Sequence, residues 1–236
     1  MAAAKENVEI GDEIFQQLYE LLDDEQNGHV TKTKILTIMD ECGISRKDAR
    51  LKKMMDELDR IPRTQPITME QFKNITQNNI ALLDRIIRGN LVIPNFQEFA
   101  EQIRTIYNTV KENKGGDVAR YIPQLSRVNP EQFAVAVCTV DGQRIELGEV
   151  DNHYCVQSTC KPINYCIALE RNGEEKVHQH VGREPSGRSF NEITLNNKGL
   201  PHNPMINAGA IMCSALIEPQ GSLADRFDDV MKVWEA

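Results

Sequence analysis

The chain has 236 residues, of which 40% are hydrophobic, so it can form one large domain or two smaller domains around buried cores. Its formal net charge of −8 argues against a nucleic-acid partner, because proteins that bind phosphate backbones usually show clusters of Lys and Arg. No apolar run reaches the length of a membrane span, so we expect no membrane partner either.

The histidines and cysteines show no arrangement typical of a metal site. His178 and His180 alternate without a third ligand nearby, so we interpret them as polar surface residues. The cysteines form no CxxC pair and lie mostly in apolar segments, which favours buried thiols over disulfides or zinc ligands. They are Cys42, Cys138, Cys155, Cys160, Cys166 and Cys213. The sequence therefore predicts no metal and no cofactor.

Residues 8–113 have the apolar spacing of helices. Leu51, Met54, Met55 and Leu58, for example, recur at intervals of three and four residues. The same spacing relates Ile14, Leu18, Leu21 and Leu22, and again Leu82, Leu83, Ile86 and Ile87. We therefore predict an all-helical bundle of short helices in this half of the chain.

Three positions in this half carry helix-start signals. Thr68 followed by Gln71, and Asn95 followed by Glu98, have the spacing of a capping box. Ser45 precedes a polar first turn. We expect a helix to begin at each of these three positions.

The segment 113–117 interrupts the helical spacing with two adjacent glycines. It is the predicted boundary between an N-terminal domain, residues 1–113, and a second domain, residues 117–236. In the second domain an apolar, β-branched run over 133–140 precedes Asp141-Gly142, a type I′ turn signal, and 143–147 alternates like a returning strand. We predict a β-hairpin there and helices over 157–170 and 206–217. The whole chain is thus expected to be α+β.

Two segments of the helical half resemble EF-hand calcium loops. In residues 23–34 oxygens stand at the first, third and fifth positions, but Lys34 stands where calcium needs a bidentate Glu. In residues 59–70 the terminal acids are kept, but Ile61, Arg63 and Thr64 replace two ligands and the glycine. We interpret both segments as helix–loop–helix scaffolds that bind no metal.

Ser158 and Lys161 form an S-x-x-K motif at the entrance to the helix predicted after the hairpin. Residues three apart share one face of a helix, so the Lys161 amine can approach the Ser158 hydroxyl. Pro162 fits a helix only in its first turn, which puts Ser158 at the amino-terminal end. There, unpaired backbone N–H groups and the helix dipole can stabilise an oxyanion during acyl transfer. Lys161 can act as a base only when neutral, a state favoured by burial or by a neighbouring cation.

The surroundings of the motif decide between two interpretations. Alone, an S-x-x-K spacing recurs by chance on many surfaces, and Lys161 could be a solvated residue. Its position after a strand pair and before an apolar helix is that of the serine β-lactamase and transpeptidase architecture. The S-D-N and K-T-G motifs of those enzymes are absent, so we predict kinship of fold rather than lactam chemistry.

Five strings, in one order along the chain, resemble the animal kidney- and liver-type glutaminases, which are serine-dependent enzymes. They are YIPQL at 121–125, VCTVDGQR at 137–144, QSTCKP at 157–162, VGREPSG at 181–187 and PHNPMINAGAI at 201–211. The helical half is similar to the EF-hand-like bundle that precedes the catalytic domain in this family. The resemblance therefore implies an EF-hand-like bundle followed by part of a β-lactamase-like catalytic domain.

The resemblance also implies a reaction and a set of site residues. Ser158 matches the nucleophile that attacks the side-chain amide of L-glutamine, expels ammonia and leaves a γ-glutamyl ester, and Lys161 matches the adjacent general base. Tyr121, Gln157 and Asn207 match positions that contact the substrate, and their phenol and amide groups suit its carboxylate and amine. The implied function is hydrolysis of L-glutamine to L-glutamate and ammonia.

Further expectations concern the extent of the chain and its setting. In the family the catalytic domain continues beyond the position of Ala236 and supplies further substrate contacts, an oxyanion donor and a second catalytic tyrosine. We therefore expect a chain truncated within that domain. The alternative function is that of a catalytically silent short isoform or fragment acting as an interaction or regulatory module. The family implies homo-oligomers, activation by phosphate and a mitochondrial location, whereas the acidic residues 1–15 favour a cytosolic form or an alternative start.

Overall fold

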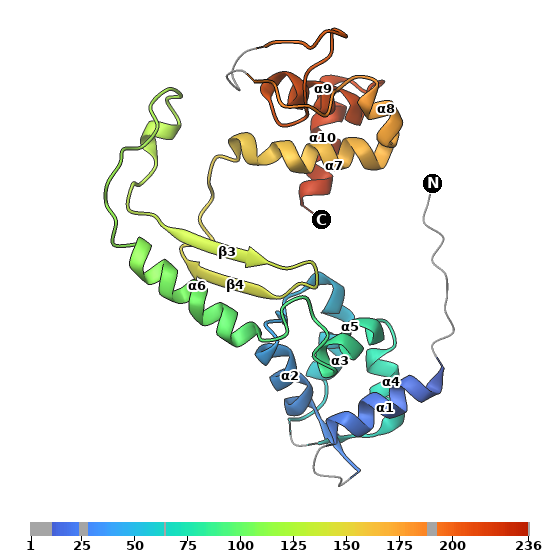
Figure 1. Ribbon diagram of the computed structural model, residues 1–236. Helices are drawn as coiled ribbons and strands as arrows, with labels where there is room; N and C mark the ends of the chain where they lie inside the picture. Colours follow the sequence, from blue (N-terminus) through green and yellow to red (C-terminus); the bar gives the residue numbers. More distant parts are fainter. Residues whose placement is uncertain (1–10, 24–27, 64, 188–192, 236) are drawn as a thin grey trace. The chain divides into compact units, whose positions relative to one another are not determined.

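Figure 1 shows a computed structural model of the chain, which describes residues 11–23, 28–63, 65–187 and 193–235. The chain forms two compact units, residues 1–152 and 153–236. Helices are combined with antiparallel strands, which confirms the predicted α+β class. The units separate after Asn152 and not at 113–117, and the predicted division into 1–113 and 117–236 stays a prediction.

The first unit begins with a helical bundle around one apolar core. Its helices are α1 (Asp12–Leu22), α2 (Lys32–Glu41), α3 (Lys52–Asp59), α4 (Met69–Thr76) and α5 (Ile80–Ile87), with a 3-10 turn η1 (Ala49–Leu51) before α3. The next helix, α6 (Phe96–Val110), packs its buried Phe96 and Ala100 against Ile145 in a separate apolar core. Leu18, Leu58, Phe72 and Leu83 are among the fully buried side chains of the bundle. The predicted apolar spacing therefore identifies the core, except at Leu21, which is half exposed.

The bundle is not purely helical. A short strand β1 (Val30–Thr31) pairs antiparallel with β2 (Pro66–Ile67), so that Val30 lies opposite Ile67. The Tyr19 hydroxyl donates a hydrogen bond to the Ile67 carbonyl at 2.6 Å and lies 3.1 Å from the Gly28 carbonyl. The all-helical prediction was therefore wrong at these loops, because pairing two extended segments satisfies backbone groups that a loop would bury unpaired.

The three helix-start signals have different outcomes. Thr68 and Gln71 form the predicted reciprocal capping box of α4. At α6 the Asn95 side chain bonds the Glu98 side chain directly and caps no backbone N–H. At Ser45 no helix begins, because Asp48 is the residue whose side chain accepts from the backbone before η1.

The predicted β-hairpin is confirmed as β3 (Ala134–Cys138) paired with β4 (Arg144–Gly148). Its turn is not the predicted type I′, which needs positive φ at both central residues. Only Gly142 has positive φ, 94°, and the Gly142 N–H donates to the Thr139 carbonyl. The Thr139 N–H also bonds the Gln143 carbonyl, so three residues form the loop.

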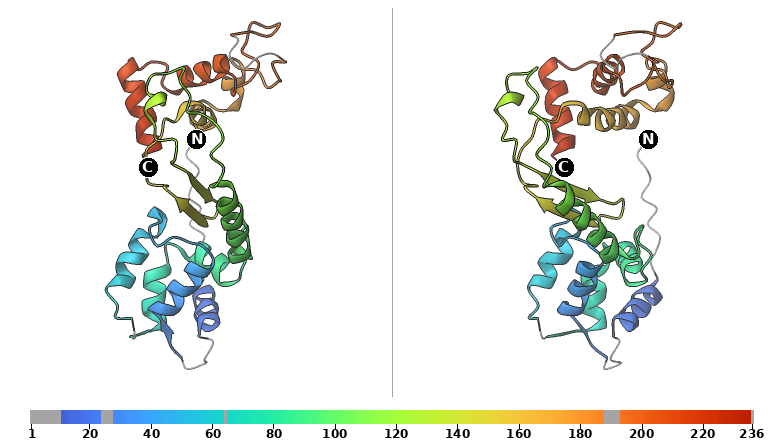
Figure 2. Two further views of the ribbon diagram at one scale, coloured as in Figure 1. Left: turned by 90° about the vertical axis from the view of Figure 1, so that its left-hand side faces the viewer. Right: turned by 60° about the vertical axis from the view of Figure 1, so that its left-hand side comes forward.

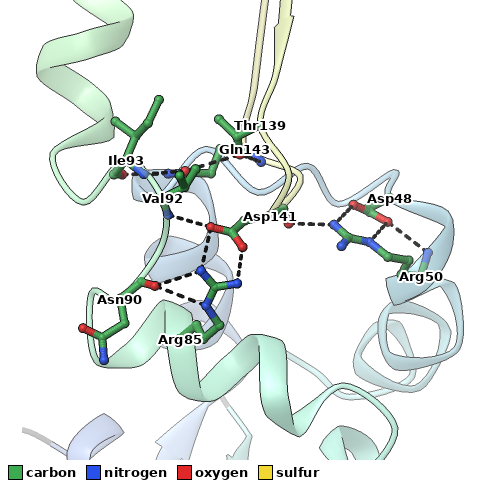
Figure 3. Close-up of polar contacts among 9 residues, drawn as sticks. All are labelled: Asp48, Arg50, Arg85, Asn90, Val92, Ile93, Thr139, Asp141 and Gln143. Carbon is green, nitrogen blue, oxygen red and sulfur yellow. Dashed lines mark hydrogen bonds and ion pairs between the residues drawn. The ribbon is translucent and has the colours of Figure 1, made fainter. Parts of the chain in front are cut away.

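Gln143, at the end of this turn, joins the hairpin to the bundle (Figure 3). The Gln143 side chain is 0% exposed, and its amide donates to the carbonyls of Cys42 at 3.0 Å and Ile93 at 2.9 Å. Its amide oxygen accepts from the Ile93 N–H at 3.2 Å. The Arg144 N–H donates to the Gly43 carbonyl at 2.8 Å. The hairpin is therefore bonded to the loops before η1 and α6.

Asp141 adds an ion pair to the attachment of the hairpin to the bundle (Figure 3). Its carboxylate, only 2% exposed, pairs with the Arg85 guanidinium and accepts from the Val92 N–H at 2.6 Å. The Arg50 guanidinium donates to the Asp141 carbonyl at 2.8 Å, and its hydrogen bond to Asp48 lowers the pKa of that buried carboxyl. An arginine and a carboxylate joined by two hydrogen bonds are held in one relative orientation, in addition to pairing their charges.

The second unit consists of helices and the irregular segments that connect them. Its elements are a 3-10 turn η3 (Gln157–Thr159), α7 (Cys160–Asn172), α8 (Glu174–His178), α9 (Asn207–Ile217) and α10 (Leu223–Trp234). α7 packs along α9 (Figures 1 and 2) around a small core that includes Ile167, Val177 and Cys213. The predicted helices at 157–170 and 206–217 are confirmed. α10 was not predicted, although Ser222 and Asp225 form a capping box at its start.

Within the described ranges, no helix is both long and apolar enough to cross a membrane.

Candidate active site

Ser158 lies in the η3 turn that leads directly into α7. Its side chain is exposed, and Pro162 lies in the first turn of α7, as predicted. The preceding residue, Gln157, has φ 42°, which is the one positive φ of a non-glycine residue in the described part of the chain. A left-handed backbone costs such a residue about 1–2 kcal/mol, and strain of this kind clusters at functional sites.

Lys161 and Asn207 are in direct contact. The half-buried Lys161, second residue of α7, donates from Nζ to Oδ1 of Asn207, the first residue of α9, at 2.7 Å. A lysine nitrogen bound to an amide must face the amide oxygen, because the amide nitrogen only donates. This orientation leaves the Nδ2 of Asn207 available as a donor to a further group.

The packing of α7 on α9 determines this contact. Ile167 and Ala168 on α7 meet Cys213 on α9 in the shared core. The Asn172 side chain, at the end of α7, donates to the Leu216 carbonyl of α9 at 2.8 Å. The two helices are therefore fixed to each other along their length, and the ends that carry Lys161 and Asn207 meet.

Two predicted site residues lie outside the contact of α7 with α9. The Gln157 side chain is exposed beside Ser158. Tyr121 lies in the irregular segment between α6 and β3, is 74% exposed and belongs to the first unit. Its relation to Ser158 and Lys161 stays a prediction.

Asn203, just before α9, and Gly209, in the first turn of α9, pack closely against each other and were missed as functional candidates. Asn203 Oδ1 accepts from the Met205 and Ile206 N–H groups. The Asn203-Pro204 dipeptide is a turn-initiation signal that indicates such a role in the sequence. The close packing of Gly209 leaves no comparable signal in a single sequence.

In the second EF-hand-like loop, one acidic side chain is hydrogen-bonded to a lysine. Asp59, the first residue of that loop, accepts from Lys32 Nζ at 2.7 Å, and Lys32 is only 8% exposed. This hydrogen bond lowers the pKa of Asp59. Residues 24–27 of the first loop, and Thr64 of the second, lie outside the described residues. Among residues 11–23, 28–63, 65–187 and 193–235, no group of three His, Cys, Asp or Glu side chains could hold a metal.

His178 differs from the surface residue that was predicted. Its Nδ1 donates to the Val181 carbonyl at 2.9 Å, and its Nε2 is hydrogen-bonded to the Tyr165 hydroxyl at 2.8 Å. The half-buried ring thereby ties α8 to α7. His180 is exposed.

The six cysteines are free thiols with different environments. Cys213 is buried, and burial raises the pKa of its thiol to about 11. Burial also raises the pKa of Cys42. Cys138, Cys155 and Cys166 are exposed, so the prediction of buried thiols was wrong at these three positions, where apolar sequence neighbours do not cover the side chain.

Comparison with known families assigns both halves of the chain. Residues 116–236 match the sequence model of the Glutaminase family, and residues 14–94 match that of an EF-hand domain. The chain belongs to the glutaminase family. The glutaminase match covers just over half of the chain and includes η3, α7 and α9, which carry Ser158, Lys161 and Asn207.

Individual relatives agree with this assignment. A putative glutaminase 2 of Caenorhabditis elegans is 40% identical over 227 residues, which are 91% of this chain and 38% of the relative. The mitochondrial liver isoform of glutaminase of Mus musculus is 39% identical over 203 residues, 84% of this chain and 34% of its own length. The chain thus spans somewhat more than a third of the length of these curated relatives.

Solved structures, one of them named a probable glutaminase, resemble this chain. A probable glutaminase, ybaS, is 29% identical with a TM-score of 0.53, covering 58% of this chain and 45% of the other. A structure of Mglu in its tris and glutamate form is 32% identical with a TM-score of 0.51, covering 57% of this chain and 30% of the other. The prediction of a glutaminase fold preceded by an EF-hand-like segment is confirmed.

Proposed function

We propose that the protein hydrolyses the side-chain amide of L-glutamine, with Ser158 as the nucleophile and Lys161 as the general base. The observation that carries the proposal is the hydrogen bond between Lys161 and Asn207. It places a half-buried lysine, one helical turn from a serine, against a residue that the family resemblance independently assigns to substrate contact.

In the first step the Ser158 Oγ attacks the side-chain amide carbon of glutamine. Neutral Lys161 takes the hydroxyl proton and passes it to the amide nitrogen, the C–N bond breaks, and ammonia leaves. The product on the protein is a γ-glutamyl ester of Ser158. Backbone N–H groups at the start of α7 are suited to stabilise the negative oxygen of the tetrahedral intermediate.

In the second step water attacks the ester carbon. Lys161 takes a proton from the water and returns one to Ser158 Oγ as the ester bond breaks, which releases L-glutamate and restores the starting state. No electron transfer or cofactor enters this balance. A solved structure of Mglu in its glutamate form, 32% identical to this chain, supports glutamate as the product.

The substrate must also be held at its charged end. A donor is available on Asn207, because its Oδ1 is occupied by Lys161 and its Nδ2 is left for an acceptor such as a carboxylate. We assign Gln157 and Tyr121 to substrate contact as well, on the family resemblance. An unpaired buried polar group costs about 1–3 kcal/mol, so these contacts set specificity for a small polar substrate.

We further propose a mitochondrial location and a homo-oligomeric state. The mitochondrial liver isoform of Mus musculus supports the location, since it is 39% identical over 84% of this chain. Homo-oligomers follow from the family resemblance. Immunofluorescence of the tagged protein in cells of its source, and its mass by light scattering, would test the two statements; diffuse cytosolic signal or a monomeric mass would contradict them.

The activity is tested by measuring ammonia release from L-glutamine by the purified 236-residue protein, with and without inorganic phosphate. L-asparagine serves as the comparison substrate. We expect release from glutamine that Ser158→Ala reduces at least 1,000-fold, because removal of a catalytic nucleophile leaves only binding contributions, on the order of the residual seen in serine hydrolases. Ser45→Ala, at a serine between α2 and η1 in the helical bundle, is the matched control.

Either of two results would contradict the proposal. Unchanged activity in Ser158→Ala would exclude this serine as the nucleophile. No ammonia from a folded wild-type protein would favour the alternative function, an interaction or regulatory module.

A further inference from the structure

We propose that Asn203 and Gly209 are positioning residues that seat Asn207 against Lys161. Neither residue is required by the S-x-x-K motif or by the substrate contacts assigned above. The inference rests on the proposed function for its catalytic meaning, while its structural content can be tested without turnover.

Asn203 organises the chain immediately before α9. Its Oδ1 accepts from the N–H groups of Met205 at 3.0 Å and Ile206 at 3.2 Å, and its Nδ2 donates to the Glu184 carbonyl at 2.9 Å. Ile206 is buried and is the residue at which α9 is entered. One side chain therefore determines both the direction of the entry into α9 and its attachment to a neighbouring segment.

That neighbouring segment holds the same stretch by backbone hydrogen bonds. The Gly182 N–H donates to the Pro201 carbonyl at 2.7 Å, and the Glu184 N–H donates to the His202 carbonyl at 3.0 Å. A Cβ atom on Gly182 would lie only 2.5 Å from the His202 carbonyl oxygen. Residues 201–203 are thus tied to 182–184 before the chain turns into α9.

Gly209 lets this turn lie directly on the first turn of α9. A Cβ atom at position 209 would overlap the carbonyl oxygen of Asn203 and lie 3.1 Å from the Pro204 Cα. Both neighbours are backbone atoms, which cannot move aside as the end of a flexible side chain can. Any larger residue would push the 203–204 turn away from α9 and with it change the position of Asn207, two residues earlier.

The position of Asn207 matters because of the geometry of a lysine base. A neutral amine has two N–H groups and one lone pair, and Asn207 Oδ1 takes one of the N–H groups. Fixing that bond restricts where the lone pair can point, and proton transfer requires it to point at the hydroxyl. A displacement of roughly 1 Å can cost about 100-fold in rate.

The experiment measures competitive acetylation of the folded protein by acetic anhydride, with mass spectrometry of the lysine-containing peptides. The readout is the labelling rate of Lys161 divided by that of Lys176, an exposed lysine on α8. Asn207→Ala, Asn203→Ala and Gly209→Ala should each raise this ratio about tenfold, because the amine loses a partner that withholds it from the reagent. Asn197→Ala, at an exposed position in the same region, is the matched control and should leave the ratio unchanged.

A double variant separates positioning from general loosening. If Asn203 acts through Asn207, adding Asn203→Ala to Asn207→Ala raises the ratio no further. Asn203→Asp keeps the acceptor oxygen but loses the Nδ2 donor to the Glu184 carbonyl, so it gives a ratio between those of the wild type and Asn203→Ala. A further rise in the double variant, or an unchanged ratio in folded Asn203→Ala, would overturn the proposal. Gly209→Ala is the variant most at risk of unfolding, and in that case the Asn203 variants decide alone.

The outcomes also separate this proposal from the proposed function. Labelling that follows the expected pattern in a protein without glutaminase activity contradicts the proposed function and not the seating. Glutaminase activity together with an unchanged Lys161 labelling ratio in the Asn203 and Gly209 variants contradicts only the positioning role of these two residues.

Discussion

Gln157 combines a left-handed backbone with a side chain that the family resemblance assigns to the substrate. Its φ of 42° is disfavoured for every residue with a Cβ atom, and the exposed side chain gains no core packing in return. The residue that best fits this backbone would be glycine, which lacks the amide. Gln at this position therefore lowers the stability of the fold, and we infer that its amide is retained for contact with the substrate.

This interpretation predicts different stabilities for two variants that lose the same amide. Gln157→Gly should be more stable than Gln157→Ala by about 1 kcal/mol, because only glycine relieves the strained backbone. Urea unfolding followed by circular dichroism measures the difference. Both variants should lose ammonia release to a similar extent. Equal stability of the two would mean that position 157 stores no strain.

Among the elements, the hairpin is the one whose sequence signals were strongest and whose connections were least predictable. The apolar, β-branched run before β4, the Asp141-Gly142 dipeptide and the alternation over 143–147 indicated the strand pair correctly. Nothing in them indicated that Gln143 would bond Cys42, 101 positions earlier. Local patterns report local hydrogen bonds, as at Thr68, whereas a buried side chain that bonds a remote backbone leaves no periodicity in a single sequence.

The same limit applied to the site. The S-x-x-K spacing indicated that Ser158 and Lys161 lie at one helix end, which depends on three residues of local structure. The contact of Lys161 with Asn207 depends on how α7 packs on α9, and only the family resemblance pointed to Asn207. Asn203 and Gly209, whose role is visible only through packing, were missed.

The attachment of the hairpin predicts a measurable loss of stability. In Gln143→Leu the leucine fills a similar buried space, but the Cys42 and Ile93 carbonyls and the Ile93 N–H lose their hydrogen-bond partners. We expect a loss of on the order of 3 kcal/mol in the free energy of unfolding of the first unit. Gln132→Leu makes the same substitution at an exposed position just before the hairpin and should change stability little. Similar losses in both variants would show that Gln143 is not a joint.

For the molecule as a whole, the two family matches and the two compact units divide the chain at different places. The glutaminase match begins at residue 116, whereas the first compact unit extends to Asn152 and includes the hairpin. The segment that looks like a domain boundary in sequence, 113–117, is thus followed by residues that return to the bundle through Asp141 and Gln143. The position where the sequence pattern changes therefore differs from the position where the two compact units divide.

A cleavage experiment distinguishes the two. A site for a sequence-specific protease is inserted between Gly115 and Gly116, and the cut protein is passed over a size-exclusion column under native conditions. The two pieces should elute together, because the shared core of Phe96, Ala100 and Ile145 and the hydrogen bonds of Gln143 and Asp141 still hold them. Cut protein that also carries Gln143→Leu and Asp141→Ala should separate at a lower urea concentration than cut protein without these substitutions. Separation of the unsubstituted cut protein in the absence of urea would mean that bundle and hairpin are independent bodies.

The bundle binds the hairpin partly through the uncharged, buried amide of Gln143. An amide has no proton to gain or lose near neutrality, and its bonds to buried carbonyls are shielded from dissolved ions. The neighbouring contact between Arg85 and Asp141 is an ion pair, and the Arg85 side chain is 45% exposed, so this contact weakens as the salt concentration rises. The connection between hairpin and bundle therefore has one part that responds to dissolved salt, the ion pair, and one part that does not, the hydrogen bonds of Gln143.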